Sequence, residues 1–254
     1  MSVSPASFKA DRNNYLQQER IDLAAAFHLA VLNDWHEAIA NHFSLAVSDD
    51  GSQFLMNPRW QHFSRISASD LMLLDVNDTS TMDQPNAPDP SAWCIHGAIH
   101  RNLPQARCLL HVHSPYATAL ACLKDPEIKP IDQNTARFFN RVVYDMGYDG
   151  IAHRDDEGER IAACLGDFRI MMMANHGVMV VADDVAKAYD TLYYLERACK
   201  TLMLAYASGQ PLNIMSDELA ERTAKDWETY ANSAYSHFDE MKQVLVAQGS
   251  VFAD

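Results

Sequence analysis

The stretch Leu109–Pro115, with the sequence LLHVHSP, decides the fold because it carries a buried strand into the start of a helix. Residues two apart on a strand point to the same face, so the side chains of His111 and His113 are predicted to project side by side. Pro115 is of the residue type favoured at the first position of a helix, which predicts that a helix begins directly afterwards. The strand is thus expected to end in two neighbouring imidazoles.

A third histidine occupies a tight turn further along the chain. His176 lies in the triplet Asn175-His176-Gly177, between two apolar runs that predict strands, and Gly177 allows close approach of the backbone. Three histidines with one open position are typical of catalytic metal sites. A lone H-x-H pair, or a histidine in a turn, is often only structural. The combination of His111, His113 and His176 predicts a divalent metal, with zinc favoured and manganese or iron as alternatives.

Length and charge limit the classes of partner. The chain has 254 residues, which suits one domain, predicted to span 15–254 after a flexible N-terminus at 1–14. It carries 34 acidic against 20 basic residues and a formal charge of -14, so phosphate backbones and anionic lipids repel it. We therefore expect no nucleic-acid and no membrane partner. A small anionic substrate is still compatible, because a bound metal reverses the sign of the field within one cleft.

The cysteines and the apolar runs indicate the compartment. The five cysteines are scattered and never form a C-x-x-C pair, so neither a disulfide framework nor a cysteine zinc site is predicted. The N-terminal residues lack the apolar core of a signal peptide, and no apolar run is long enough to span a bilayer. We expect a cytoplasmic protein.

Apolar periodicity predicts alternating helices and strands. The predicted helices cover 21–39, 67–70, 93–101, 115–123, 184–208 and 217–248. The predicted strands cover 45–48, 53–56, 106–113, 169–174 and 178–181, and 71–76 enters the interior. Asp, Asn, Ser, Thr and Pro at 78–90 predict a surface loop, and the acidic residues 155–157 are predicted to lie in a solvated loop.

Several motifs occur in the order in which one known family has them. These are NHFS at 41–44, FLMNP at 54–58, ISASDL at 66–71, HVHSP at 111–115 and ANHG at 174–177. Over roughly 20–210 the chain resembles the class II aldolase/adducin family. The resemblance implies an α/β fold with three α/β/α layers and a mostly antiparallel central sheet. It also implies a metal on the three histidines and a homotetramer with active sites at subunit interfaces.

The chain departs from the aldolases of this family at two places. Their acid/base Glu corresponds to Ala92, whose methyl group transfers no proton, and the adducin-like members also lack that Glu. Their phosphate loop corresponds to 57–60, where Pro58 has no N–H to donate and Trp60 replaces a small residue. Arg59 offers a fork suited to a carboxylate, although a surface or subunit ion pair is an equal alternative.

The candidate site residues follow from these motifs. The substrate-binding candidates are Asn41, Asn57, Arg59 and Ser91. His96 and His100 lie four apart on a predicted helix and are candidates to replace the missing base, although each is more often a structural histidine. Tyr230 is a weaker catalytic candidate, because a C-terminal Tyr closes over the site in family enzymes.

These observations favour an enzyme over a scaffold. The leading hypothesis is a metal-dependent lyase that acts on a small carboxylated or hydroxylated substrate by decarboxylation or aldol-type C–C cleavage. The alternatives are a non-enzymatic adducin-like binding module, a non-haem iron oxygenase and a sugar-phosphate aldolase. The three retained histidines argue against the scaffold, and Ala92 with Trp60 argues against the sugar-phosphate aldolase.

Overall fold

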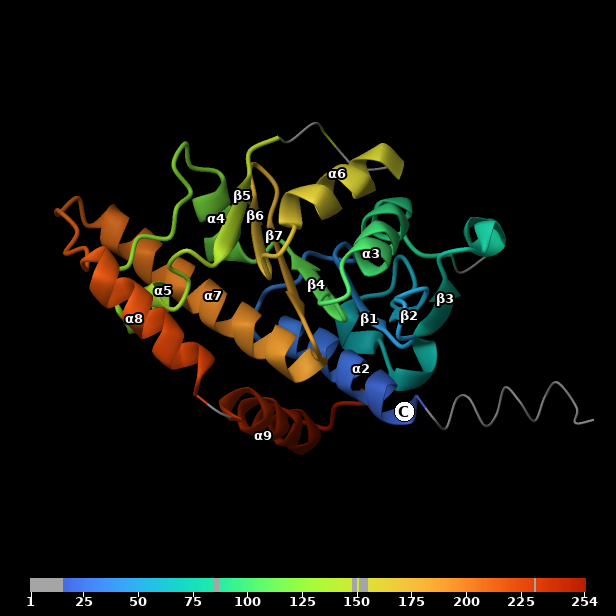
Figure 1. The fold of residues 1–254 in the computed structure, drawn as a ribbon. Helices are drawn as coiled ribbons and strands as arrows, with labels where there is room; N and C mark the ends of the chain where they lie inside the picture. Colours follow the sequence, from blue (N-terminus) through green and yellow to red (C-terminus); the bar gives the residue numbers. More distant parts are fainter. Residues whose placement is uncertain (1–15, 85–86, 148–149, 151–154, 231) are drawn as a thin grey trace, which may run out of the picture.

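The computed structural model describes residues 16–84, 87–147, 150, 155–230 and 232–254. The predicted flexible N-terminus at 1–14 lies outside the described residues. A seven-stranded sheet forms the centre, in the order β3-β2-β1-β4-β7-β6-β5 (Figure 1). The strands are β1 His42–Ala46, β2 Gln53–Met56, β3 Met72–Asp75, β4 Cys108–Val112, β5 Val142–Asp145, β6 Ile170–Met173 and β7 Val178–Ala182.

The sheet is mixed, which corrects the expectation of a mostly antiparallel one. The pairings of β1 with β2 and β4, of β2 with β3, and of β7 with β4 and β6 are antiparallel. At the edge, β5 pairs with β6 in parallel. The chain leaves β5 and returns through the helix α6 Asp155–Leu165 before it enters β6. Such a crossover brings two consecutive strands into the same direction.

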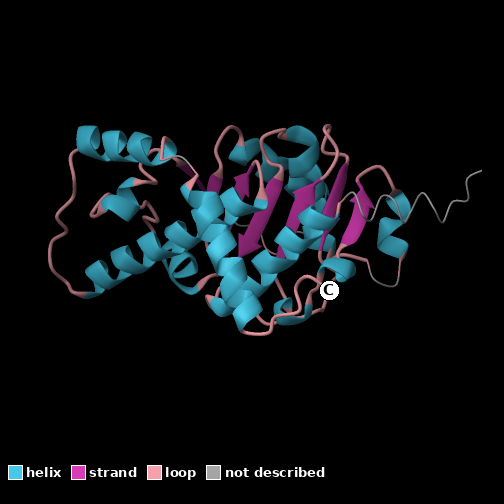
Figure 2. Ribbon diagram, turned by 90° about the horizontal axis from the view of Figure 1, so that it is seen from below, coloured by secondary structure: helices cyan, strands magenta, loops and turns pink. Residues whose placement is uncertain are grey.

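Helices cover both faces of the sheet, as the three-layer α/β/α expectation requires (Figures 1 and 2). One face packs on α2 Gln17–Leu32, α7 Val185–Ala207 and α9 Ser233–Ala247, and the other on α3 Pro90–Asn102 and α6. The other helices of the described residues are α4 Pro115–Ala121, α5 Gln133–Ala136, α8 Asp217–Glu228 and the 3-10 turns η1 Phe63–Arg65, η2 Ala68–Asp70 and η3 Thr79–Asp83. Among the described residues, no helix is both long and apolar enough to cross a membrane.

Alternation along β4 separates the two cores and places the site. Leu110 and Val112 point to the layer of α2 and α7, whereas Leu109 belongs to the core under α3 and α6. His111 is two residues from Leu109 and therefore lies on the α3 side. His42 in β1 is the register partner of His111 and faces the same layer. The strand period thus gathers histidines beneath α3.

Three predicted elements differ from the structure. The first helix ends at Leu32, and Asp34 and Ala38 then have positive φ of 58° and 49°, which excludes a helix to 39. The C-terminal helix is divided into α8 and α9 where Asn232 has φ 65°. The residues 155–157 begin α6 and are no loop, and Glu157 accepts hydrogen bonds from Arg160 at 2.8 Å.

Candidate metal centre

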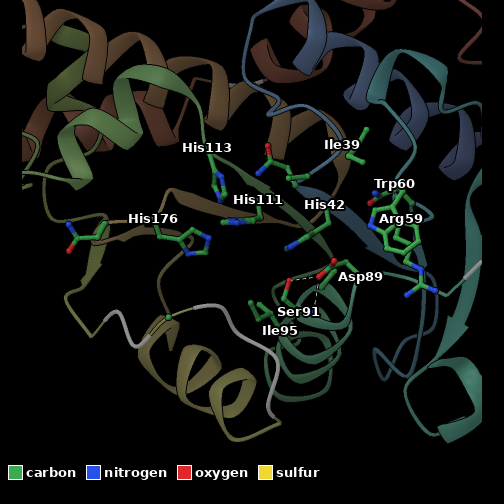
Figure 3. A pocket seen from close by; sticks show the side chains of 16 residues that line it. Ile39, His42, Arg59, Trp60, Asp89, Ser91, Ile95, His111, His113 and His176 are labelled. Carbon is green, nitrogen blue, oxygen red and sulfur yellow. Dashed lines mark hydrogen bonds between the residues drawn. The ribbon is translucent and has the colours of Figure 1, made fainter. Parts of the chain in front are cut away.

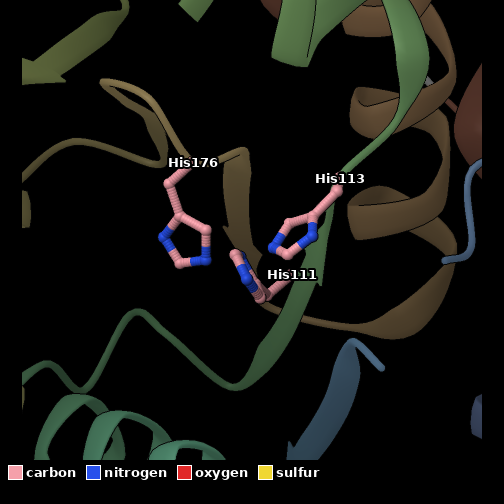
Figure 4. Close-up of side chains that lie close together, drawn as sticks. All are labelled: His111, His113 and His176. Atoms are coloured by element: carbon pink, nitrogen blue, oxygen red, sulfur yellow. The ribbon is translucent and has the colours of Figure 1, made fainter. Parts of the chain in front are cut away.

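Three histidines, two at the end of β4 and one in the turn that leads into its neighbour β7, converge on one point (Figure 4). His111 lies in β4, His113 follows the end of β4, and His176 lies in the turn between β6 and β7. One ligand nitrogen of each ring lies within 4.8 Å of those of the other two. The ring centroids are 4.7, 4.8 and 5.1 Å apart. Imidazoles that share one ion, with bonds of about 2.0–2.1 Å, must lie close together in this way.

The hydrogen bonds of His111 and His113 leave one nitrogen of each ring for a metal. Nδ1 of His111 donates to the carbonyl oxygen of Val178 at 3.0 Å, which leaves Nε2 of the neutral ring with a lone pair. Nδ1 of His113 contacts the carboxylate of Glu37, and its Nε2 is buried without a hydrogen-bond partner in the described part of the chain. Burial of an unpaired nitrogen costs free energy, which a bound cation would offset. The donor set therefore fits a divalent metal.

Burial keeps these rings in the form that binds metals. Desolvation, followed by the neighbouring imidazoles, lowers the pKa of His111 well below its usual value. Desolvation and His113 lower the pKa of His176 to about 4. Neutral imidazole has the lone pair that coordinates a metal. At neutral pH no proton has to leave His111 or His176 before a cation binds.

Gly177 allows the turn to approach the end of β4. A Cβ at this position would lie 2.5 Å from the carbonyl oxygen of Val112 and 2.6 Å from Cδ2 of His113. Neither atom belongs to a freely moving chain end, so any side chain here would push strand and ring apart. The preceding Asn175 has φ 57°, a left-handed conformation that Asn tolerates. The sequence expectation of close approach at Gly177 agrees with this geometry.

Glu196 on α7 fixes the chain just after His113. Its carboxylate accepts hydrogen bonds from the hydroxyl of Ser114 at 2.7 Å and from the backbone N–H groups of Tyr116 and Ala117 at 2.8 Å. These are the unpaired donors at the start of α4. Pro115 predicted that a helix begins here, as it does. The cap comes from a residue distant in sequence, which local patterns do not reveal.

A cavity of about 440 Å³ opens beside the three histidines (Figure 3). All four predicted substrate-binding residues line it, together with Ala92, Trp60 and His42. Asn57 and Ser91 are held by local hydrogen bonds: Oδ1 of Asn57 accepts from the N–H of Phe43 at 3.2 Å, and Oγ of Ser91 donates to Asp89 at 2.6 Å.

Asn41 and Arg59 have donors to offer a ligand. Oδ1 of Asn41 accepts from the N–H of Glu37 at 3.0 Å, and its Nδ2 is buried without a partner among the described residues. The guanidinium of Arg59 lies 4.5 Å from the ring centroid of Trp60, and no ion pair of Arg59 occurs within the ranges that the structure describes. This arrangement disfavours an ion pair within the chain as its role. The cavity wall therefore carries donors suited to an anion.

The predicted catalytic residues are not in the cavity. His96 and His100 are 0% and 2% exposed and lie behind the wall, where Ser44 Oγ contacts Nδ1 of His96 at 2.5 Å and Nε2 of His100 at 2.7 Å. Tyr230 is 66% exposed, packs on Trp227 and is not among the residues that line the cavity. Within this chain, the structure does not bring these three residues to the metal centre.

His42 is the site residue that the sequence reasoning missed. It lines the cavity, and its ring stacks on that of His111 at 4.9 Å. Its Nδ1 lies 2.7 Å from Nε2 of His96. Desolvation lowers the pKa of His42 to about 4. The available signal was its place inside the motif NHFS at 41–44.

Comparison with known proteins agrees with this architecture. The sequence model of the Class II Aldolase and Adducin N-terminal domain matches residues 21–203. A "Putative aldolase class 2 protein" from Caulobacter vibrioides is 31% identical over 204 residues, which cover 80% of this chain and 79% of the relative. The "Decarboxylase NovR" from Streptomyces niveus is 28% identical over 240 residues, which cover 89% of this chain and 87% of the relative.

A solved structure extends the similarity to the whole chain. An aldolase II superfamily protein from Pseudomonas syringae superposes with a TM-score of 0.86 at 30% sequence identity, covering 99% of this chain and 98% of that chain. The similarity thus includes the C-terminal helices α8 and α9, which lie beyond the matched domain.

Proposed function

Because this chain belongs to the class II aldolase and adducin family, we propose that it is a metal-dependent lyase acting on a small carboxylated or hydroxylated substrate. The observation that carries the proposal is Nε2 of His113, which has no hydrogen-bond partner among the described residues and is buried where His111 and His176 converge. A protein that used this fold only as a scaffold would have no use for a buried donor set of this kind. Zinc is the first choice of metal, since imidazole is among its preferred ligands.

The cavity wall supports a carboxylate as the anionic group. Arg59 offers a planar fork, and Asn41 offers an amide NH₂ group that has no partner among the described residues. The segment that binds phosphate in the aldolases is poorly suited to it here. Pro58 has no N–H to donate, and the large ring of Trp60 lies at the rim with 69% exposure. The family of the chain includes decarboxylases and sugar-phosphate aldolases. Arg59, Pro58 and Trp60 favour a substrate with a carboxylate over one with a phosphate.

The chemistry follows from the groups present. A bound divalent cation would act as a Lewis acid and stabilise the charge that develops when a C–C bond breaks. Arg59 and Asn41 would orient the carboxylate. Ala92 supplies no acid or base, so a reaction that needs little proton transfer from the protein, such as loss of carbon dioxide, suits this site better than aldol cleavage of a sugar phosphate. The homotetramer expected from the sequence is part of this proposal.

Metal content tests the proposal. Protein purified without added metal is analysed for bound elements beside two variants, His113→Ala and the control His62→Ala, which changes a histidine that does not line the cavity. We expect close to one equivalent of bound divalent metal in wild type and in the control. We expect much less bound metal in His113→Ala, which lacks one of the three ligands. Equal metal content in all three proteins, or a folded wild type that binds none, would overturn it.

A substrate screen separates the two anion classes. Wild-type protein loaded with zinc is offered small 3-oxo acids, whose loss of carbon dioxide leaves an enolate that a cation stabilises, and 4-hydroxy-2-oxo acids, whose retro-aldol cleavage leaves an enolate and releases an aldehyde. Carbon dioxide and aldehyde are the readouts, and sugar phosphates are tested in parallel. We expect turnover with the acids and loss of most of it in Arg59→Ala. Cleavage of a sugar phosphate instead would show that Trp60 and Pro58 leave room for a phosphate.

A further inference from the structure

Four buried side chains form one continuous row of hydrogen bonds that ends at the metal centre. From the far end, the row runs from the carbonyl of Ala106 through His100, Ser44 and His96 to His42. The separations are 2.8, 2.7, 2.5 and 2.7 Å. The three rings and the hydroxyl are 0% to 8% exposed. We call this set the histidine relay.

The carbonyl at the far end fixes the direction of every hydrogen bond in the relay. A carbonyl only accepts, so Nδ1 of His100 carries a proton. In a neutral ring Nε2 then accepts, and it accepts the only hydroxyl proton of Ser44. With its proton given to His100, the Ser44 oxygen accepts from Nδ1–H of His96.

The hydrogen bonds keep this direction as far as the cavity. Neutral His96 has a lone pair on Nε2, so Nδ1 of His42 must donate to it. Nε2 of His42 is then left with a lone pair. Burial keeps the rings neutral, since desolvation lowers the pKa of His100 to about 4 and that of His96 well below its usual value.

The ring of His42 lies beside the metal site but outside the ligand set. His42 lines the cavity and stacks on His111, with the rings 29° apart. The set of ligand nitrogens that lie within 4.8 Å of one another contains His111, His113 and His176 and does not contain His42. In Figure 3 the His42 ring projects from β1 into the space between His111 and Asp89.

We propose that the histidine relay locks His42 in the Nδ1–H tautomer, so that its Nε2 is a fixed hydrogen-bond acceptor that selects substrates with a hydroxyl group. This inference rests on the proposed function for the position of the substrate. With Arg59 and Asn41 as donors for a carboxylate, an acceptor at His42 defines a hydroxy acid as the substrate class. His42 is then a specificity-determining residue, and Ser44, His96 and His100 are positioning residues.

The far end of the relay argues against proton transfer along it. A backbone carbonyl takes up no proton, so the row does not lead a proton from the cavity to solvent. Ser44 has a single hydroxyl proton, so the two rings it joins cannot both receive a hydrogen bond from it. The carbonyl of Ala106 fixes which atom donates in each hydrogen bond of the relay, and so determines which nitrogen of His42 carries the proton.

The tautomer is measured directly by nitrogen NMR of the metal-free protein with 15N-labelled histidine. We expect His42, His96 and His100 each to show a protonated Nδ1 and an unprotonated Nε2. A protonated Nε2 on His42, or a doubly protonated ring at pH 7, would overturn the proposal. Because no metal is needed, failure of the proposed function leaves this result interpretable.

Variants test whether the relay is the cause. Ser44→Ala removes the shared hydroxyl, and we expect His42 to lose its single tautomer and to show signals of both forms. Ser80→Ala, which changes an exposed hydroxyl of η3, should leave the His42 signals unchanged. An unaltered His42 tautomer in folded Ser44→Ala would contradict the causal role. If Ser44→Ala does not fold, the wild-type spectrum still decides the tautomer.

A matched pair of small acids tests the acceptor. Glycolate and acetate differ by one hydroxyl group and are titrated into zinc-loaded protein, with the Nε2 resonance of His42 as the readout. We expect glycolate to shift this resonance and to bind about fivefold or more tightly, the factor that one net hydrogen bond contributes. Equal affinities, or no response to glycolate, would overturn the hydroxyl assignment. Absence of zinc binding would count against the proposed function alone.

Discussion

Two of the three imidazoles of the site, His111 and His113, are oriented by what their Nδ1 atoms contact. His111 donates through Nδ1 to the carbonyl of Val178, and His113 contacts Glu37 through Nδ1. Both rings therefore turn Nε2 to the same point. Partners of this kind set the orientation and basicity of metal ligands. Replacing Glu37 should therefore lower the affinity for the metal without removing a ligand.

Gly177 gives the sharpest residue-scale prediction. In Gly177→Ala the new methyl carbon would meet the carbonyl of Val112 and the ring of His113 at 2.5 and 2.6 Å. We expect a loss of about 1–3 kcal/mol in the free energy of unfolding, because overpacking forces the strand and the ring to move. We also expect weaker zinc binding, measured by competition with a chelator. The control is Gly97→Ala, where the nearest neighbour of the new methyl carbon would be 3.8 Å away.

An unchanged zinc affinity in Gly177→Ala would contradict this account of the turn. It would mean that His113 moves freely enough to accommodate a methyl group. Loss of stability with full retention of zinc affinity would have the same meaning for the metal site.

At the scale of elements, β4 and α4 form the frame on which the site depends. The strand ends at Val112, and α4 begins at Pro115 with three donors held by one carboxylate of α7. Glu196 is 6% exposed, so its charge is balanced by these donors and not by water. Helix α7 thereby sets the direction in which the chain leaves His113.

Glu196→Gln tests this frame. An amide keeps the shape of the side chain but turns an NH₂ group toward a backbone N–H, so at least one of the three hydrogen bonds is lost. We expect a decrease of about 1–3 kcal/mol in the free energy of unfolding, measured by urea denaturation. The control is Glu240→Gln on an exposed face of α9, which should change little. Equal stability of both variants would contradict the role of Glu196 as the cap.

Local sequence signals predicted the elements around the site but not their long-range contacts. The H-x-H strand and the turn at Gly177 follow from alternation, apolar runs and one glycine, and the structure places them as expected. Glu196, Glu37 and His42 come from positions far from their partners, and only the folded sheet brings them there. The parallel edge at β5 was missed for a similar reason, since its strand is short and half-buried. His96 and His100 were noticed as histidines, but their burial behind the wall required the packing of α3.

At the scale of the whole molecule, the buried histidines couple stability to pH. The pKa of His42 and of His100 is about 4 in the folded chain, lowered by desolvation from 6.5. The unfolded chain therefore binds more protons between these values, so stability is fully present above pH 6.5 and is lost as the pH falls toward 4.

Denaturation of the metal-free protein in urea at pH 7.5 and pH 5 tests this coupling. We expect a free energy of unfolding that is lower at pH 5 by about 1 kcal/mol or more, because a tenfold change in a protonation equilibrium corresponds to about 1.4 kcal/mol. The carboxylates with lowered pKa, such as Asp145 beside Arg160, titrate below this window and do not produce the change. A constant or higher stability at pH 5 would show that the relay histidines are not buried as neutral rings.

We assign His111, His113 and His176 to a single divalent ion. Anomalous X-ray diffraction from crystals of protein loaded with one equivalent of zinc, recorded at the zinc absorption edge, locates that ion. We expect one strong peak at about 2.0–2.1 Å from a nitrogen of each of the three rings. A peak at any other place in the chain, or no peak at the three histidines in zinc-loaded crystals, would contradict it.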